Sequence, residues 1–310
     1  MIRGYRREGS VALALLAFLL FLAWRAPDFY RATPLRDLAV RSAPVLVAAL
    51  GMTLVIVCRQ IDISIGSQAS VCGLAAGLLA KAGLPMPLVA LATVALGAAL
   101  GAVNGWLVAA LKLPSIVATL ATLVILRESL RYGREGESVR DLPADFQWFG
   151  LGQAAGQWLV VVAALVVLLA FAWGTRHLAA GRSVYATGSD PEAARLAGIR
   201  PGRVVFWVFV AMGALAGLSS LLGAIQLPDV DPKGGTGLEM QVIAAVVVGG
   251  SAISGGRGTM VGTALGVLLL GLINPALVFL HASPEWEKAI QGGIILLAVA
   301  SDGLGRGGRP

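Results

Sequence analysis

The sequence predicts an all-α, polytopic integral membrane protein with about ten transmembrane helices. Hydrophobic residues form 57% of the 310-residue chain, charged residues form only 13%, and long apolar runs recur along its whole length. Soluble proteins carry about 25% charged residues, and one core of this size cannot enclose so much apolar surface. The surplus apolar surface is therefore expected to face lipid.

The expected spans are apolar runs of about 17–25 residues, the length that a helix needs to cross a hydrocarbon core of about 30 Å. The first run resembles a secretory signal, but no small-residue cleavage site follows it. Trp24 and Tyr30 instead lie where an interfacial aromatic belt is expected. We expect one transmembrane domain over residues 1–310, with spans at 9–25, 37–58, 64–81, 87–110, 114–131, 157–175, 203–223, 238–253, 259–280 and 286–302.

The even number of spans places both termini on the same side of the membrane. Arg3, Arg6 and Arg7 precede the first span, so the positive-inside tendency places that side in the cytoplasm. Two polar segments interrupt the spans. Residues 132–156 are expected on the extracytoplasmic side and residues 176–203 in the cytoplasm.

The cytoplasmic segment predicts a short helix outside the bilayer. Ser189 or Asp190 can cap its start, Pro191 suits the first helical position, and Gly198 can end it. The helix is either a solvated connector or a docking helix for a cytoplasmic partner. The docking face would consist of Ala193, Leu196 and Ala197.

The composition leaves little for chemistry. Two Cys and two His are too few for a disulfide framework or a structural zinc or iron–sulfur site, so no cofactor, metal or catalytic residue is expected. The net charge of +7 comes mainly from scattered Arg residues, without the basic stripe typical of nucleic-acid binding. None of the four Lys residues lies in a P-loop pattern, so hydrolysis of ATP would need another chain.

Asp62 is the most unusual single residue, because a carboxylate beside the membrane is costly unless it faces a cavity or a partner. Arg59 lies three residues earlier and could pair with it within a helix. Asp62 is therefore either a neutralised charge at a helix end or a residue that lines an inner gate.

Small residues at four-residue spacing predict close packing between helices. They are Gly97, Gly101, Gly105, Gly213, Gly217, Gly262 and Gly266. The segments around Asn104 and Asn274 show a weak internal sequence similarity, and their spans run in opposite directions. This similarity predicts an inverted repeat of five plus five spans.

Four segments occur in a characteristic order and spacing: residues 62–67 (DISIGS), 114–120 (PSIVATL), 181–199 and 244–258. Together they resemble the permease subunit of bacterial ribose-type ABC importers. The resemblance implies a pair of permeases, identical or related, in the inner membrane, with ATPase subunits bound in the cytoplasm and a periplasmic sugar-binding protein outside. It also implies that the third segment couples to the ATPase through Gly181, Arg182, Tyr185, Gly188, Asp190, Pro191, Glu192, Ala193, Ala194, Arg195, Leu196, Ala197 and Gly198.

Polar residues within or beside the spans are candidates for the substrate path. Such groups often serve only as hydrogen-bond links between helices, but a polyol also needs weak, exchangeable hydrogen bonds along its route. The candidates are Asp62, Ser64, Asn104, Ser115, Thr119, Thr122, Gln226, Gln241 and Asn274.

We therefore expect a permease, not an enzyme, that imports a small sugar by alternating access driven by a separate ATPase. The segment from Gly133 to Pro143, continuing to Gly150, is similar to rhamnose permeases, in a branch that also holds autoinducer-2 importers. The alternatives are a permease for autoinducer-2, an amino acid or another small polar solute, an ion-coupled secondary transporter, and a membrane-embedded enzyme. The last two classes need ionisable groups deep in the spans or a catalytic cluster.

Overall fold

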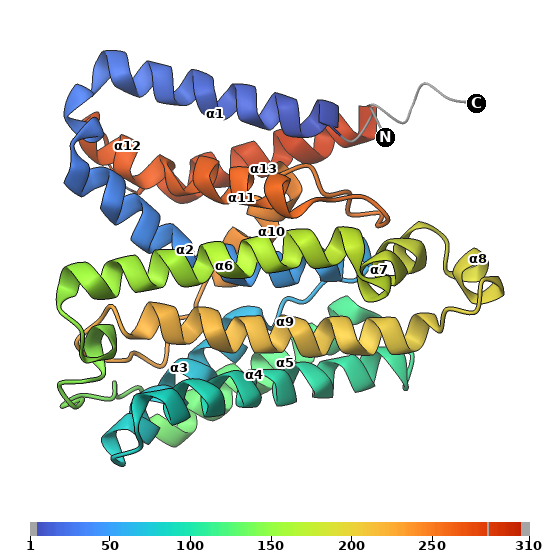
Figure 1. Ribbon diagram of the computed structural model, residues 1–310, viewed down its shortest axis with the longest axis horizontal. Coiled ribbons are helices and arrows are strands. Elements are labelled where there is room, and N and C mark those ends of the chain that lie inside the picture. The colour runs from blue at the N-terminus through green and yellow to red at the C-terminus, as the bar shows by residue number, and fades with distance from the viewer. Residues whose placement is uncertain (1–4, 284, 305–310) are drawn as a thin grey trace.

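The computed structural model describes residues 5–283 and 285–304 of the chain, and the described part is built from helices (Figure 1). Two 3-10 turns, η1 (Pro27–Tyr30) and η2 (Gln147–Gly150), lie between them. The α-helices are α1 (Tyr5–Arg25), α2 (Ala32–Val57), α3 (Ile65–Lys81), α4 (Met86–Ala109), α5 (Ser115–Arg134), α6 (Gln153–His177), α7 (Ala179–Ser189), α8 (Pro191–Leu196), α9 (Pro201–Ala224), α10 (Leu238–Val248), α11 (Met260–Gly271), α12 (Ile273–Phe279) and α13 (Trp286–Leu304).

The long helices lie side by side along the long axis of the molecule, as Figure 1 shows. The start of α1, the end of α13, and helices α7 and α8 lie at one end, which we call the α8 end. Residues 132–156 lie at the opposite end, which we call the loop end. The two polar segments of the sequence are thus separated by the full length of the helices.

The all-α membrane class is confirmed, but ten complete spans are not. Within the described residues, five helical stretches are long and apolar enough to cross a membrane by themselves: α2, α4, α6, α9, and α11 with α12. Helix α10 has only 11 residues, because the glycine-rich segment that follows Val248 forms a turn where the sequence predicted further helix. Helix α3 has 17 residues and begins only after irregular backbone at residues 58–64.

Glycines allow pairs of helices to touch at their backbones, as the four-residue spacing predicted. A Cβ atom at Gly101 of α4 would lie 2.2 Å from the Phe209 carbonyl oxygen of α9, and one at Gly213 would lie 2.1 Å from the Gly97 carbonyl oxygen. Between α10 and α11, a Cβ at Gly266 would lie 2.0 Å from the carbonyl oxygen of Ala245. No larger residue fits at these contacts without separating the helices.

The segment at residues 176–203 contains two helices where the sequence predicted one. The predicted start is confirmed, because Asp190 Oδ1 accepts the backbone amides of Glu192 and Ala193, with Pro191 at the first helical position of α8. Helix α7 was missed because Gly181 and Gly188 are typical of loops. Both glycines are instead sites of close backbone contact.

We expect Gly101→Ala to destabilise the packing of α4 on α9, because the added Cβ would overlap the Phe209 carbonyl oxygen. Overpacking of this kind costs about 1–3 kcal/mol, which should lower the thermal unfolding midpoint of the detergent-purified protein. Gly133→Ala in α5 is the control, since its Cβ would meet nothing within 4 Å. Equal midpoints for the two variants would show that the glycine contact is not needed.

Candidate functional site

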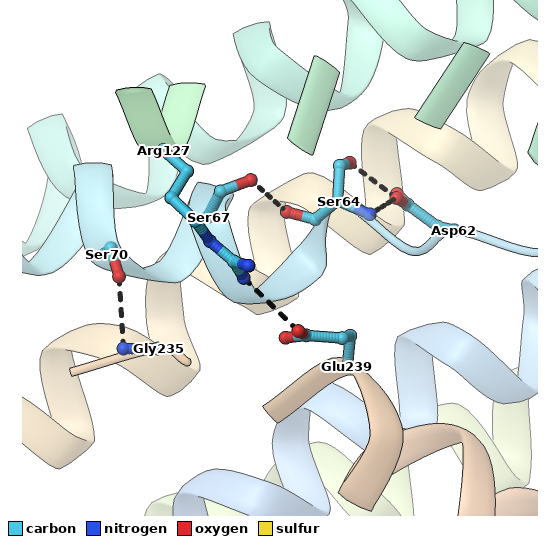
Figure 2. A network of polar contacts seen from close by, with 7 residues as sticks. All are labelled: Asp62, Ser64, Ser67, Ser70, Arg127, Gly235 and Glu239. Atoms are coloured by element: carbon cyan, nitrogen blue, oxygen red, sulfur yellow. Dashed lines mark hydrogen bonds and ion pairs between the residues drawn. The ribbon is translucent and has the colours of Figure 1, made fainter. Parts of the chain in front are cut away.

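A buried polar cluster fills the break between α2 and α3. We define it as Asp62, Ser64, Gln68 and Asn104, none of which is more than 1% exposed. Asp62 Oδ1 accepts the backbone amide of Ser64 at 2.9 Å and its hydroxyl at 2.5 Å, as Figure 2 shows. Asp62 Oδ2 accepts a hydrogen bond from Gln68 Nε2 at 3.2 Å, and Ser64 Oγ accepts one from Asn104 Nδ2 of α4 at 2.8 Å. The cluster therefore ties α4 to the start of α3.

Hydroxyl groups of α5 complete the hydrogen bonding of the irregular backbone. The amide of Ile61 donates to Ser115 Oγ at 3.2 Å, and that of Ile63 donates to Thr119 Oγ1 at 3.1 Å. Non-helical backbone is tolerated at membrane depth only where protein or water satisfies its polar groups. Ser115 and Thr119 therefore hold the break together, and Thr122 lies one turn further along α5 and donates to the Thr119 carbonyl oxygen.

The predicted pairing of Arg59 with Asp62 is wrong. Residues 59–64 are not helical, so the three-residue spacing does not bring the two side chains together. The Arg59 guanidinium instead donates to the carbonyl oxygens of Gly188 and Ser189 at the end of α7. Asp62 accepts hydrogen bonds from uncharged protein groups rather than pairing with a cation.

An ion pair lies beside the cluster, towards the loop end. Arg127 of α5 donates to Glu239 Oε1 of α10 at 3.2 Å (Figure 2). Glu239 is 8% exposed, and its other oxygen packs on Gly66, where an added Cβ would lie 2.0 Å from it. Ser67, one residue further along α3, donates to the Ser64 carbonyl oxygen at 2.8 Å. The ion pair thus links α5 and α10 across the first turn of α3.

Two cavities meet at Ser70, whose Oγ accepts the amide of Gly235 at 3.0 Å. One cavity, of about 210 Å³, lies among α2, α3, α9 and the start of α10. The other, of about 200 Å³, is the loop-end cavity. Its polar lining consists of Ser67, Ser70, Arg127, Glu128, Arg131, Lys233 and Thr236.

The structure brings five of the predicted path residues together, with a sixth nearby. Asp62, Ser64, Asn104, Ser115 and Thr119 meet at the break, and Thr122 lies one turn away.

The remaining path candidates lie elsewhere. Gln226 Nε2 donates to the carbonyl oxygens of Leu222 and Val40 near the end of α9, and Gln241 lies on α10. Asn274 is exposed and donates to Glu287 at 2.6 Å. Because Asn104 is buried and Asn274 exposed, the sequence similarity around them does not correspond to equivalent sites, and the inverted repeat is not confirmed.

The α7–α8 segment carries the residues predicted to couple to an ATPase. Ala193, Leu196 and Ala197 of the predicted docking face are exposed, Leu196 to 86%, whereas Ala194 is 4% exposed and packs within the chain. Tyr185 donates to the Gly258 carbonyl oxygen at 2.8 Å, which joins α7 to the turn between α10 and α11.

Sequence reasoning missed Gln68, Arg127 and Glu239, and it missed the role of Arg59. The sequence contained a signal for Gln68, Arg127 and Glu239. Each is a polar or charged residue inside or at the start of an apolar run, and such a residue is costly in a membrane unless it has a partner. The partners themselves lie far away along the chain and could not be read from spacing.

An all-α membrane bundle with a buried polar interior beside non-helical backbone is an architecture of membrane transporters. A family model described as the permease component of the branched-chain amino acid transport system matches residues 35–299. The chain belongs to this family and is a permease of the ribose-type branch of bacterial ABC importers. It is a multi-pass protein of the inner membrane and not an enzyme.

Curated relatives match nearly the whole chain. The autoinducer 2 import system permease protein LsrC of Salmonella typhi is 35% identical over 96% of this chain and 86% of its own length. LsrC of Escherichia coli O157:H7 is 37% identical over 98% of this chain and 89% of its own. The ribose import permease protein RbsC of Escherichia coli K12 is 33% identical over 97% and 95%. No solved structure matches.

We expect Asp62→Ala to destabilise the protein, because it leaves the Ser64 amide and the Gln68 side chain without their acceptor in a buried site. Each unsatisfied buried group costs about 1–3 kcal/mol. Glu137→Ala is the control, since Glu137 is an exposed acid outside the cluster. Thermal unfolding in detergent measures both effects, and an equal loss in the two variants would contradict the role given to the cluster.

Proposed function

We propose that this chain carries a small, uncharged polyol or a related sugar-derived solute inward by alternating access, driven by a separate ATPase. The observation that carries the proposal is the polar cluster with its neighbours Ser115 and Thr119. Hydroxyl and amide groups dominate it, and its one carboxylate is held by protein donors. Such a lining offers exchangeable hydrogen bonds without a fixed charge that would hold a neutral solute tightly.

We place the α8 end in the cytoplasm and the loop end outside. The basic residues that precede the first apolar run support this orientation through the positive-inside tendency. In this orientation, the loop-end cavity, which is lined by hydroxyl groups and by charged residues of both signs, receives the solute from a periplasmic binding protein. The solute then passes inward to the break between α2 and α3.

The ATPase subunit binds at α8 in this proposal. The helix lies beyond the ends of the long helices (Figure 1) and exposes Ala193, Leu196 and Ala197. The chain itself has no P-loop pattern, so ATP is hydrolysed by the partner. A second permease, identical or related, completes the transporter, and residues 1–310 form one permease domain.

The substrate class follows from the relatives and the polar lining together. LsrC is named for autoinducer 2 and RbsC for ribose, and the segment at residues 133–150 favours rhamnose among the sugars. Two observations disfavour coupling to protons or sodium. Both oxygens of the one fully buried carboxylate, Asp62, already accept protein hydrogen bonds, and Glu239, the other well-buried acid in the described residues, is paired with Arg127.

Uptake tests the substrate and the energy source. Cells that express the chain with its ATPase and binding protein should accumulate one of three radiolabelled solutes, namely L-rhamnose, D-ribose or autoinducer-2. Accumulation should cease when ATP is depleted and persist when an ionophore collapses the ion gradients while ATP is maintained. Uptake that follows the ion gradient would instead establish a secondary transporter.

We expect Ala197→Glu to weaken binding of the ATPase, because a carboxylate on the docking face would be desolvated without a partner, at a cost of roughly 1–3 kcal/mol. Membrane insertion should be unchanged, since α8 lies outside the bilayer. Co-purification of the ATPase and uptake should both fall. Ala179→Glu, at an exposed residue of α7 outside the predicted coupling residues, is the matched control. Undiminished co-purification of the ATPase with Ala197→Glu would identify α8 as a simple connector.

A further inference from the structure

The end of α2 has an unusual residue at a position that normally favours glycine. The helix ends in a Schellman motif, in which the Arg59 amide donates to the Ile56 carbonyl oxygen at 2.9 Å and the Gln60 amide to that of Val55 at 3.0 Å. Arg59 has a φ of 62°, a conformation that residues with a Cβ atom seldom adopt. The same position is occupied by Gly83 after α3, Gly198 after α8 and Gly250 after α10.

The side chain of Arg59 gives a reason for this residue. Its Nε donates to the Gly188 carbonyl oxygen at 2.6 Å and its Nη2 to that of Ser189 at 2.5 Å. These are the last two residues of α7, where carbonyl groups lack partners within the helix and a cation is favourable. The last turn of α7 has no basic residue of its own, so Arg59 caps α7 from another helix.

The contact is a close-packed joint with no room for adjustment. A Cβ at Gly188 would lie 1.7 Å from the Val57 carbonyl oxygen, and the Gly256 amide donates to that same oxygen at 2.8 Å. A Cβ at Gly255 would lie 2.1 Å from Arg59 Cγ. The end of α7, the end of α2 and the turn before α11 therefore have to move together.

The joint continues directly into the polar cluster. After Arg59 the backbone passes through Ile61 and Ile63, which are held by hydroxyls of α5, to Asp62 at the start of α3. On its other side, α8 begins at Pro191, immediately after the capped end of α7. The two hydrogen bonds of Arg59 thus join the chain beside α8 to the chain that enters the buried break.

We propose that Arg59 is the positioning residue that transmits movement of α8 to the break between α2 and α3. The inference rests on the proposed function, in which α8 binds the ATPase. Closure of the ATPase shifts the end of α7, and the hydrogen bonds to the Gly188 and Ser189 carbonyl oxygens then pull Arg59 with it. Arg59 in turn moves the irregular backbone that follows it, and this movement changes the solvent exposure of the polar cluster and of α5. Arg59 itself does not touch the solute.

The experiment uses the complete transporter in proteoliposomes, with Thr122→Cys in α5 as a reporter for N-ethylmaleimide. Labelling is compared without nucleotide and after trapping with ATP and orthovanadate, and the signal of the chain without the reporter is subtracted. In the otherwise unchanged chain we expect trapping to change the labelling rate by at least about five-fold, the lower end of typical coupling between sites.

Arg59→Gly removes both hydrogen bonds while suiting the local backbone, so the variant should fold. We expect it to keep its bound ATPase and to hydrolyse ATP, while trapping changes the labelling rate by less than about two-fold, below typical coupling. His281→Gly is the matched control, because His281 occupies the same position of a Schellman motif after α12, with a φ of 55°. In the His281→Gly variant, trapping should change the labelling rate as much as it does in the unchanged chain.

Full ATP-dependent labelling in Arg59→Gly would overturn the inference. Loss of the bound ATPase in that variant would also overturn it, since Arg59 would then only shape the docking surface. If Arg59→Gly does not reach the membrane, Arg59→Lys, which keeps the charge but not the paired donors, should show the same reduced response. A reporter that never responds although the ATPase binds refutes this inference alone, whereas an unchanged chain that binds no ATPase refutes the proposed function and this inference with it.

Discussion

The structure depends on one constraint, which is that irregular backbone within a membrane protein needs protein partners for its polar groups. Residues 58–64 leave the helical pattern, and the amides of Ile61, Ile63 and Ser64 donate to the side chains of Ser115, Thr119 and Asp62. This requirement fixes α5 beside the break, sets the start of α3, and draws Gln68 and Asn104 into the same buried site. The polar interior of the permease is therefore a consequence of the irregular backbone between α2 and α3.

The glycine contacts supply the rigid surroundings that such a break needs. Helices α4 and α9 touch backbone to backbone through Gly101 and Gly213, and α10 and α11 do so through Gly266. Contacts without intervening side chains leave no rotamers to rearrange, so each pair behaves as a stiff body. Conformational change is then concentrated in segments without such contacts, which include the irregular backbone between the joint around Arg59 and the start of α3.

The sequence predicted the helices much better than the site. Every expected span contains a helix, because hydropathy reports burial in lipid directly. Hydropathy does not report whether the backbone is helical, so the break at residues 58–64 and the shortness of α10 were invisible. Spacing rules assume a helix, which is why Arg59 was paired with Asp62. The true partners, Gly188 and Gln68, come from a distant helix and from beyond the break, and only the fold brings them together.

The hydrogen bond at Ser70 has a consequence for the two cavities that share this residue. A single hydrogen bond, from the Gly235 amide to Ser70 Oγ, lies where the two cavities towards the loop end meet. A hydrogen bond of this kind contributes about 0.5–1.5 kcal/mol net, only one to three times the thermal energy. Thermal motion is enough to break it, so the Ser70 hydroxyl can exchange the Gly235 amide for another hydrogen-bond partner without any input of chemical energy.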